Sequence, residues 1–451
     1  MDDKRINLMK NEKVSKAINK MAAPAIIGML VMAIYNIVDS IFVAHIGGNE
    51  IAATQVVLPL MLIASSIGLA FGIGGGSYVS RLLGANKKKE ANIASAVSFF
   101  TALGVGVALS VFNYIFMDEV LLLFGADESI LSLARQYGNF IVFGYAFTVL
   151  NMVLNNILRS EGSGNYSMIG MAVGSVLNII LDPIFIFVFD WGIAGAAIAT
   201  TVSQIVSFIV LFSNFFYKRS IVHIKPKYFL PSRKIYKQIF VVGLPTFLKQ
   251  MLISVSIGLL NTAAMRYGGA DLLASVGIIT RVIMIPNYII FGFGQGFQPL
   301  AGYNFGAKNK ERVIEGFKYT MLVTTAITSV TCIVFFLFDD AIFRIYDASP
   351  TITAYGKSGL HYYSIGMLFL GITNTITVFY QAIGRGVEAL IMSVSRQGIL
   401  YIIAIIILPR ILGVEGVLLT QTISDVASCV LAVSLIVPFL KSNKIDHLMP
   451  V

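Results

Sequence analysis

The chain has 451 residues, of which 57% are hydrophobic and only 12% are charged, and its mean hydropathy is +0.81. Soluble globular proteins carry about 25% charged residues, so this composition excludes an ordinary soluble domain and predicts a protein built for a lipid bilayer. The formal net charge of +10 could indicate nucleic-acid binding, but the distribution of the basic residues described below argues against that class.

Residues 1–20 are polar and basic. The apolar run that follows is too long for a signal peptide and contains Asp39, so we expect no cleaved leader. Twelve apolar segments can be placed in the chain, each long enough to cross roughly 30 Å of hydrocarbon. They lie near residues 18–45, 51–81, 91–116, 131–158, 165–188, 192–216, 236–266, 272–301, 311–337, 352–383, 387–409 and 414–440.

The longest basic connector divides these segments into two equal sets. We therefore expect an N-terminal six-helix lobe over residues 1–216 and a cytoplasmic basic linker over residues 217–235. A C-terminal six-helix lobe with a short cytoplasmic tail should then occupy residues 236–451.

An internal duplication relates the two halves. The loops that begin Arg81-Leu-Leu-Gly-Ala and Tyr303-Asn-Phe-Gly-Ala lie about 222 residues apart, and the same offset pairs further glycines. A constant offset along the chain is typical of a duplicated unit. Because six helices return the chain to its starting side, the pseudo-twofold axis should follow the membrane normal. The sequence predicts an all-α polytopic membrane protein with twelve transmembrane helices in two pseudo-twofold-related six-helix lobes around a central cleft.

The connectors differ in charge from one side of the membrane to the other. Most of the 33 Lys and Arg residues fall on the side of the N-terminus, whereas the opposite connectors carry mainly acids. Cytoplasmic loops of membrane proteins carry such an excess of basic residues. We therefore expect a multi-pass protein of the bacterial cytoplasmic membrane with both termini cytoplasmic, and no nucleic-acid partner. The basic connectors are the N-terminal segment, 81–90, 159–163, 217–237, 302–318, 384–388 and the C-terminal tail.

Catalytic and nucleotide motifs are missing from the sequence. The glycine-rich runs at residues 72–76 and 292–296 lie inside apolar segments, and no Lys-Ser/Thr pair follows them, so they are not phosphate-binding loops. Close helix packing is the simpler interpretation of these glycines. We expect no enzyme activity and no cofactor beyond a coupling ion.

Two carboxylates in the N-terminal half lie inside predicted membrane segments. An ionisable group in hydrocarbon is costly, and this makes Asp39 and Asp182 candidates for function. At 1.5 Å per residue, Asp39 lies about 28 Å past Lys20 and Asp182 lies about 26 Å past Asn165. Both segments run outward from the cytoplasm, so the two carboxylates should share one depth.

Each carboxylate has polar neighbours one helical turn away, Tyr35 before Asp39 and Asn178 before Asp182. Pro183 frees a backbone carbonyl and should bend its segment, and Thr200 reaches the same depth from the next segment. Asp39, Asn178, Asp182 and Thr200 together would offer oxygen ligands to Na⁺, or the two carboxylates would hold a proton. The alternative is a hydrogen-bonded polar plug that only holds the helices together.

The C-terminal half lacks this arrangement. Its own charges in membrane segments include Lys249, Arg281, Arg396 and Asp425. Arg396 lies about 14 Å into its segment from the inside, and Asp425 lies about 17 Å into the next one from the outside. This depth match predicts a buried Arg396–Asp425 ion pair, either as a structural clamp or with a role in substrate binding. The N-terminal carboxylates align instead with Leu260 and with the apolar stretch around Ala404.

Nearly the full chain resembles the multidrug and toxic compound extrusion (MATE) family, in particular the branch with MepA-like and DinF-like pumps. The resemblance rests on Asn36-Ile-Val-Asp-Ser-Ile-Phe-Val43, Leu158-Arg-Ser-Glu-Gly162, Asn178-Ile-Ile-Leu-Asp-Pro183 and the paired Gly-Ala loops. It implies twelve helices in two lobes around a cavity, and exchange of inward Na⁺ or H⁺ for outward cationic amphipathic drugs.

The resemblance also implies site residues. Asp39, Asn178, Asp182 and Thr200 match cation-site positions of the family, with Tyr35 beside them. Two further polar residues match more weakly as cation or cavity residues, and these are Asn155, which should lie nearer the cytoplasm, and Asn36. Another branch of the family couples through acids in helices 7 and 10, and this chain has none there.

The sequence thus predicts a secondary active multidrug antiporter that works by alternating access of two lobes. The closest alternative is a flippase for a lipid-linked saccharide of the same superfamily. A channel or a receptor fits less well, because paired intramembrane carboxylates have no purpose in the first and no sizeable soluble module is present for the second. The expected partners are small organic cations or amphipathic drugs and membrane lipids, and we expect a monomer.

Overall fold

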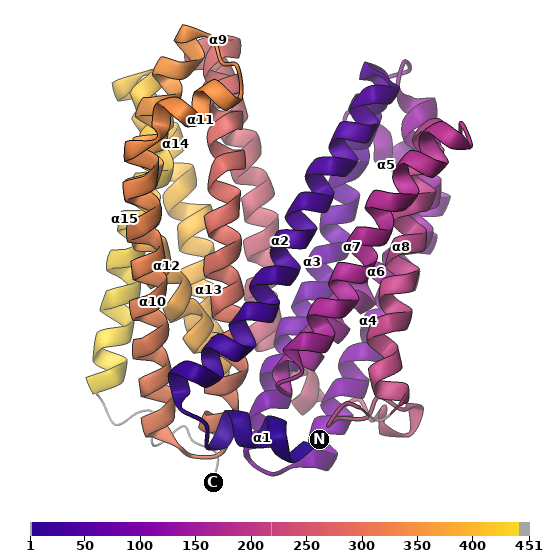
Figure 1. The fold of residues 1–451 in the computed structure, drawn as a ribbon, viewed down its shortest axis with the longest axis vertical. Helices are drawn as coiled ribbons and strands as arrows, with labels where there is room; N and C mark the ends of the chain where they lie inside the picture. Colours follow the sequence, from indigo (N-terminus) through magenta and orange to yellow (C-terminus); the bar gives the residue numbers. More distant parts are fainter. Residues whose placement is uncertain (1, 218, 442–451) are drawn as a thin grey trace.

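The computed structural model describes residues 2–217 and 219–441, and these residues form helices joined by short connectors, with no strand among them (Figure 1). The predicted tail beyond Lys441 lies outside the described residues. The N-terminal half contains α1 (Asp2–Lys10), α2 (Val14–Ile46), α3 (Gly48–Gly84), α4 (Lys88–Ile115), α5 (Met117–Leu123), α6 (Leu131–Ser160), α7 (Gly164–Pro183), the π-helical segment η1 (Ile184–Val188) and α8 (Gly192–Phe216).

The connector between the halves holds one short 3₁₀ segment, η2 (Pro226–Tyr228). The C-terminal half contains α9 (Arg233–Gly306), α10 (Lys310–Leu337), α11 (Asp339–Ile345), α12 (Pro350–Ala382), α13 (Gly386–Val394), the π-helical segment η3 (Ser395–Ile399), α14 (Leu400–Leu412) and α15 (Val414–Lys441).

Helix α9 has 74 residues and is interrupted at Gly269, whose φ of 66° and ψ of −158° are not helical. Gly243 in its first arm and Gly306 in its second both pack against the same helix, α3, so the chain must reverse at the break. The described residues contain 11 helices long and apolar enough to span a bilayer, and α9 supplies two spans. The prediction of twelve spans is therefore confirmed.

The two halves form two lobes, which lie together at the end where the described chain begins and ends, and which diverge toward the other end (Figure 1). Glycines let the helix backbones meet at the joined end. A Cβ on Gly84 of α3 would overlap the carbonyl oxygen of Tyr303 in α9, and a Cβ on Gly306 would overlap that of Arg81. These contacts are reciprocal between matching positions of the repeat, so they confirm the predicted pseudo-twofold relation.

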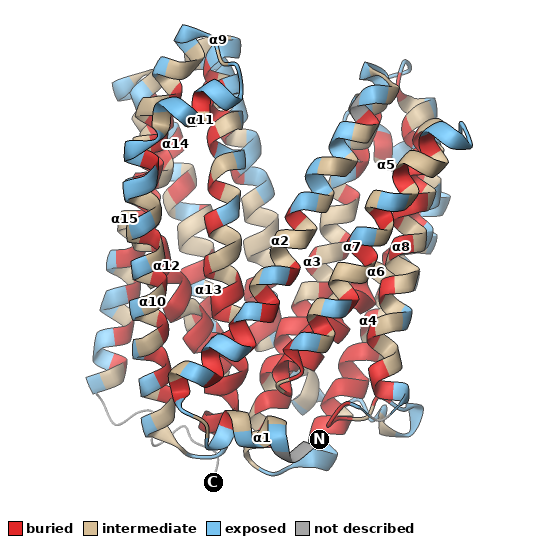
Figure 2. Cartoon of the chain, in the orientation of Figure 1, coloured by how far each residue is buried: buried red, intermediate tan, exposed pale blue. Residues whose placement is uncertain are grey.

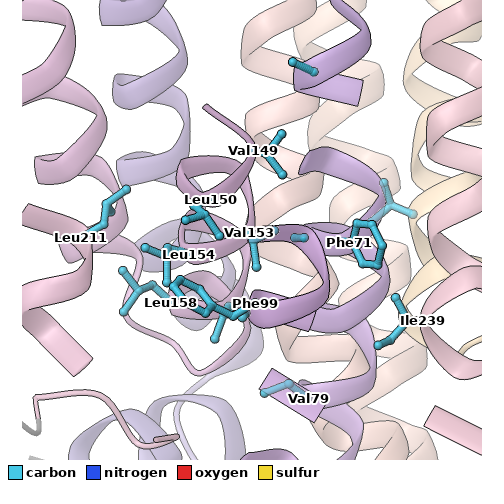
Figure 3. Close-up of a cluster of buried hydrophobic side chains, with 14 of the residues drawn as sticks. Phe71, Val79, Phe99, Val149, Leu150, Val153, Leu154, Leu158, Leu211 and Ile239 are labelled. Atoms are coloured by element: carbon cyan, nitrogen blue, oxygen red, sulfur yellow. The ribbon is translucent and has the colours of Figure 1, made fainter. Parts of the chain in front are cut away.

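Burial of side chains also stabilises the end at which the two lobes join. Buried residues concentrate where the lobes join, and the diverging end carries mostly exposed and partly exposed residues (Figure 2). In the close-up of this core, Leu154 and Leu158 of α6 lie near Phe99 of α4 (Figure 3). Across the lobes, the ring of Phe71 in α3 lies 5.5 Å from that of Phe240 in α9. The lobes are thus held firmly at one end only.

The N-terminal segment connects the lobes at this end. Helix α1 is short and polar, and it was not predicted from the sequence. Arg5 of α1 lies 3.5 Å from Glu161 at the end of α6, while Arg312 of α10 donates hydrogen bonds to the carbonyl oxygens of Met9 and Glu12. The segment therefore contacts both lobes.

The repeat also extends to the opposite end, through the short helices α5 and α11, which the sequence did not predict. Asp118 of α5 lies 2.8 Å from Arg135 of α6, and Asp340 of α11 lies 2.5 Å from Lys357 of α12. The hydrogen bond from Lys357 lowers the pKa of Asp340. Matching ion pairs thus attach the short helix to the long helix that follows it in each lobe.

Candidate cation and substrate site

The bend in the N-terminal lobe begins at Pro183, which ends α7. Proline has no amide hydrogen to donate, so the regular helical ladder cannot continue through it, and the π-helical segment η1 follows directly. Asp182 and Asn178 lie in the last turn and a half before this break. Both side chains are buried, with Asp182 fully inaccessible.

Asn178 connects two of the predicted site residues. Its side-chain nitrogen donates to Asp182 Oδ1 at 3.2 Å and to the hydroxyl of Thr200 in α8 at 3.3 Å. Asn178, Asp182 and Thr200, which the sequence assigned to one polar site, therefore meet in the interior of the lobe.

Helix α2 contributes the second carboxylate. Asp39 lies within hydrogen-bonding reach of Asp182, and Tyr35 is close enough to interact electrostatically with both carboxylates. Two carboxylates in contact repel each other unless a proton or a cation lies between them. The structure thus brings the acids of α2 and α7 into one cluster.

Three oxygen atoms of the cluster are buried without a hydrogen-bond partner among the described residues, namely Asp39 Oδ1, Asp182 Oδ2 and Asn178 Oδ1. A buried polar atom without a partner is unfavourable, so these oxygens call for a ligand that accepts their lone pairs. Carboxylate, amide and hydroxyl oxygens are the ligands that hard cations prefer. Within the part of the chain that is described, no group of three or more His, Cys, Asp or Glu side chains forms a metal cluster.

A cavity adjoins the cluster, and its empty space is about 470 Å³ when the part open to solvent is included. Asn178, Thr200 and Tyr35 belong to both the cluster and the cavity wall, so the cluster and the cavity share side chains. The remaining wall is formed by methionines and small or polar residues, namely Met32, Asn151, Met152, Asn155, Met171, Gly174, Ser175, Ser203, Gln204 and Ser207.

The two weaker sequence candidates have different positions. Asn155 lines the cavity, and its side-chain oxygen accepts a hydrogen bond from Ser167 at 2.9 Å. Asn36 is exposed on α2, and its side chain donates to the carbonyl oxygen of Met32 at 2.9 Å. The structure therefore does not bring Asn36 to the carboxylates.

Sequence reasoning missed several polar residues of this region. Tyr137 of α6 is buried and interacts electrostatically with Asp39 and Asp182. Asn151 of α6 donates to the side-chain oxygen of Gln204 in α8 at 2.7 Å, in the cavity wall. The only signal in the sequence was the presence of uncharged polar residues within apolar segments.

The C-terminal lobe contains the ion pair that the depth count predicts. Arg396 Nε donates to Asp425 Oδ1 at 2.6 Å. Arg396 lies in the π-helical segment η3, where the regular backbone ladder is interrupted. Two serine hydroxyls bond to the backbone of this segment, since Ser424 donates to the carbonyl oxygen of Arg396 and Ser256 donates to that of Gln397.

A family model described as MatE matches residues 24–184 and 245–407, which lie in the two repeats. The chain belongs to the MatE family. Together with the membrane spans, membership makes this MatE protein a multi-pass membrane transporter and not an enzyme.

Curated relatives match it over almost its whole length. The Multidrug export protein MepA of Staphylococcus saprophyticus is 31% identical over 444 residues, covering 98% of both chains. The protein of the same name from Staphylococcus aureus strain N315 is 30% identical, also over 98% of both chains.

Solved transporters share the fold. One is a multidrug resistance MATE family transporter in an outward-facing conformation, which is 28% identical, covers 99% of this chain and 98% of its own, and gives a TM-score of 0.92. Another, from Pyrococcus furiosus, is a MOP superfamily transporter whose binding pocket has a reversed polarity that suggests a different function. It is 28% identical over 99% of both chains, with a TM-score of 0.91. The two-lobe fold predicted from the sequence is confirmed.

Proposed function

We propose that this MatE protein is a secondary active antiporter of the bacterial cytoplasmic membrane. It exports cationic amphipathic compounds, drugs among them, in exchange for inward Na⁺ or H⁺. The observation that carries the proposal is the contact of Asp39 with Asp182, whose unpartnered oxygens lie beside a cavity. The relatives named as multidrug export proteins support drugs as the exported compounds.

The shared residues of the site suggest how ion and substrate are coupled. Asn178 bonds to Asp182 and also lines the cavity, so a cation that binds the carboxylates repositions part of the substrate site. A positively charged substrate in the cavity would in turn disfavour the coupling ion through repulsion. Binding of either one therefore opposes binding of the other, which is the requirement for exchange.

The basic connectors assign the joined end of the lobes to the cytoplasm by the positive-inside rule, and this orientation has both termini inside. The diverging end would then face outward, and an outward-facing state would be the one that releases substrate and accepts the coupling ion. Rocking of the two lobes about the glycine contacts at the joined end would produce the opposite state. Both lobes belong to one chain, so we propose that the monomer is the transport unit.

The energetics set a limit on stoichiometry. One cation that moves inward across 100 mV releases about 2.3 kcal/mol, enough for roughly fifty-fold accumulation of a neutral substrate. A monovalent cationic substrate that moves outward consumes the same electrical energy. One-for-one exchange of monovalent cations would then depend on the chemical gradient of the coupling ion alone.

Transport into or out of liposomes tests the proposal. Purified protein is reconstituted in liposomes loaded with a fluorescent organic cation, and either a Na⁺ gradient at constant pH or an H⁺ gradient without Na⁺ is applied. Expulsion of the dye against its gradient should depend on one of the two ions. It should fall to the level of protein-free liposomes in Asp39→Asn, while reconstituted Asp190→Asn, an exposed acid at the α7–α8 turn, stays active.

Unimpaired dye expulsion by Asp39→Asn would contradict the proposed role of Asp39 in ion coupling. If the wild-type protein responds to neither gradient, transport of a lipid-linked saccharide becomes the next function to measure.

A further inference from the structure

A second cavity lies in the C-terminal lobe, and its empty space is about 320 Å³ when the part open to solvent is included. It occupies the position that corresponds, through the repeat, to the cavity beside Asp39 and Asp182. Thr373 and Thr377 in its wall match Asn151 and Asn155 of the N-terminal cavity at the offset of about 222 residues. The remaining wall residues are Lys249, Phe291, Leu370, Asn374, Met392, Ser393, Arg396 and Gln397.

The charge of this second cavity is reversed. Lys249 corresponds to Gly28 at an offset of 221 residues, and Arg396 corresponds to Gly174 at an offset of 222. The counterparts of the N-terminal carboxylates are apolar. Arg396 is paired with Asp425, which also accepts a hydrogen bond from Gln421. The pair is neutral as a whole, so the positive charge of Lys249 is the unbalanced one.

Lys249 has no carboxylate within ion-pairing distance among the residues described. Its ammonium group lies 4.5 Å from the centre of the Phe291 ring, and its strongest charged neighbour is the guanidinium of Arg396. A charged group inside a membrane span normally pairs with an opposite charge. Lys249 instead lines a cavity and has no carboxylate partner among the residues described.

Two further donors in the wall also lack partners within the described part of the chain. The side-chain nitrogen of Asn374 and the hydroxyl of Ser393 belong to residues that are 6% and 4% exposed, and neither atom makes a hydrogen bond. Buried polar groups are nearly always hydrogen-bonded, so each unpaired one requires an explanation. The ammonium, the amide and the hydroxyl belong to three residues that line the same cavity, and an anion could balance the charge of the first and accept hydrogen bonds from all three.

We propose that the cavity of the C-terminal lobe binds an oxyanion, namely a carboxylate or phosphate group. Lys249 would provide the balancing charge, and Asn374 and Ser393 would donate hydrogen bonds to the anion. Phe291, Leu370 and Met392 supply an apolar wall beside these donors, which suits the headgroup of an amphipathic molecule. The inference adds an anion-binding site to the proposed cation antiporter and does not depend on cation coupling.

The test measures equilibrium binding without any gradient, so its outcome is independent of the transport assay. The purified full-length protein in a non-ionic detergent is titrated by calorimetry with n-decyl phosphate, and with inorganic phosphate as the soluble counterpart. Lys249→Met should weaken the binding of decyl phosphate by about tenfold or more, because it removes a charged hydrogen-bond donor. Lys249→Arg should retain most of the affinity.

Lys318→Met, at an exposed position of α10, is the matched control and should bind like the wild-type protein. Asn374→Ala is a second, neutral variant that should weaken binding by a smaller factor. Every variant, Lys249→Met included, must elute as monodisperse protein before titration. Binding of decyl phosphate alone would identify an amphipathic ligand, and equal binding of inorganic phosphate would identify soluble anions as the source.

Either of those results supports the site, provided that Lys249→Met reduces binding. Affinities that are equal in the wild-type protein and a well-folded Lys249→Met would overturn the proposal. A loss of affinity of the same size in Lys318→Met would overturn it as well, because the effect would then reflect overall charge.

Discussion

The two lobes share one fold but differ in the charge of their interiors. The N-terminal lobe places Asp39 and Asp182 beside a cavity, whereas the C-terminal lobe places Lys249 and Arg396 in the corresponding one. The counterpart of Asp39 is Leu260, which is buried in an apolar cluster. The duplicated fold has therefore kept its architecture while the chemistry of its two cavities has diverged.

The contacts that are the same in both lobes are those that determine how the helix backbones pack. The contacts of Gly84 and Gly306 at the joined end have no room for a side chain, and the short helices α5 and α11 are held by matching ion pairs at the other end. Residues that face a cavity do not determine how the helices pack. They can therefore change charge without changing the fold.

The largest effect is expected for the N-terminal carboxylates. Asp182→Asn should reduce gradient-driven dye expulsion to the background of protein-free liposomes, because under the proposed mechanism the coupling ion would lose one of its two charged ligands. If Asp39 and Asp182 hold one ion together, their effects are not additive, and the double Asn variant should be no worse than either single one. Residual coupling in both single variants that disappears only in the double variant would indicate two independent sites.

The ion pair of the C-terminal lobe should behave differently from the N-terminal acids. Arg396→Met leaves Asp425 as an unpaired buried charge and should destabilise the protein by about 3–5 kcal/mol. Replacing both residues, as Arg396→Met with Asp425→Leu, should restore most of the stability. Apparent melting temperatures from the loss of monodisperse protein on size-exclusion chromatography measure this, and a double variant as unstable as the single one contradicts it.

Substitution of the contact glycines tests the features that the two lobes have in common. Gly84→Ala and Gly306→Ala each push a methyl group into a backbone carbonyl of the opposite lobe and should each destabilise the joined end by about 1–3 kcal/mol. Gly104→Ala is the matched control, since its Cβ would meet open space in helix α4, and it should stabilise the protein by about 0.5–1 kcal/mol. Thermal unfolding measures the stability of the three variants. Equal destabilisation by all three would refute the role of the glycine contacts in joining the lobes.

The smallest effect is expected at the ion pair that attaches α11. Lys357 lowers the pKa of Asp340 below its ordinary value of 3.8, so the contribution to stability is present above that value and is lost as the pH falls through the folded-state pKa. The wild-type melting temperature should therefore fall more steeply between about pH 5 and pH 3 than that of Asp340→Asn. Asp340 is exposed, so the difference should be small and should shrink further in high salt. Parallel curves for the two proteins would show that the pair contributes nothing.

Much of the fold followed from the sequence alone. The twelve spans were visible because each must be apolar over a length that the bilayer fixes, and the duplication was visible because glycines at close contacts cannot be replaced. The common depth of Asp39 and Asp182 followed from the constant rise of a helix. The same count paired Arg396 with Asp425, which lie 2.6 Å apart in the structure.

Only the tertiary structure decided which side chains face one another. Every face of a membrane helix is apolar enough to meet lipid, so hydropathy gives the depth of a residue but not the rotation of its helix. Asn36 and Asp39 lie on the same helix, yet packing exposes the first and brings the second to Asp182. For the same reason, only the structure showed that Tyr137 lies near the two carboxylates and that the two matching cavities carry opposite charges. The rotation of each helix is fixed by close packing with its neighbours, and that packing is a property of the whole molecule.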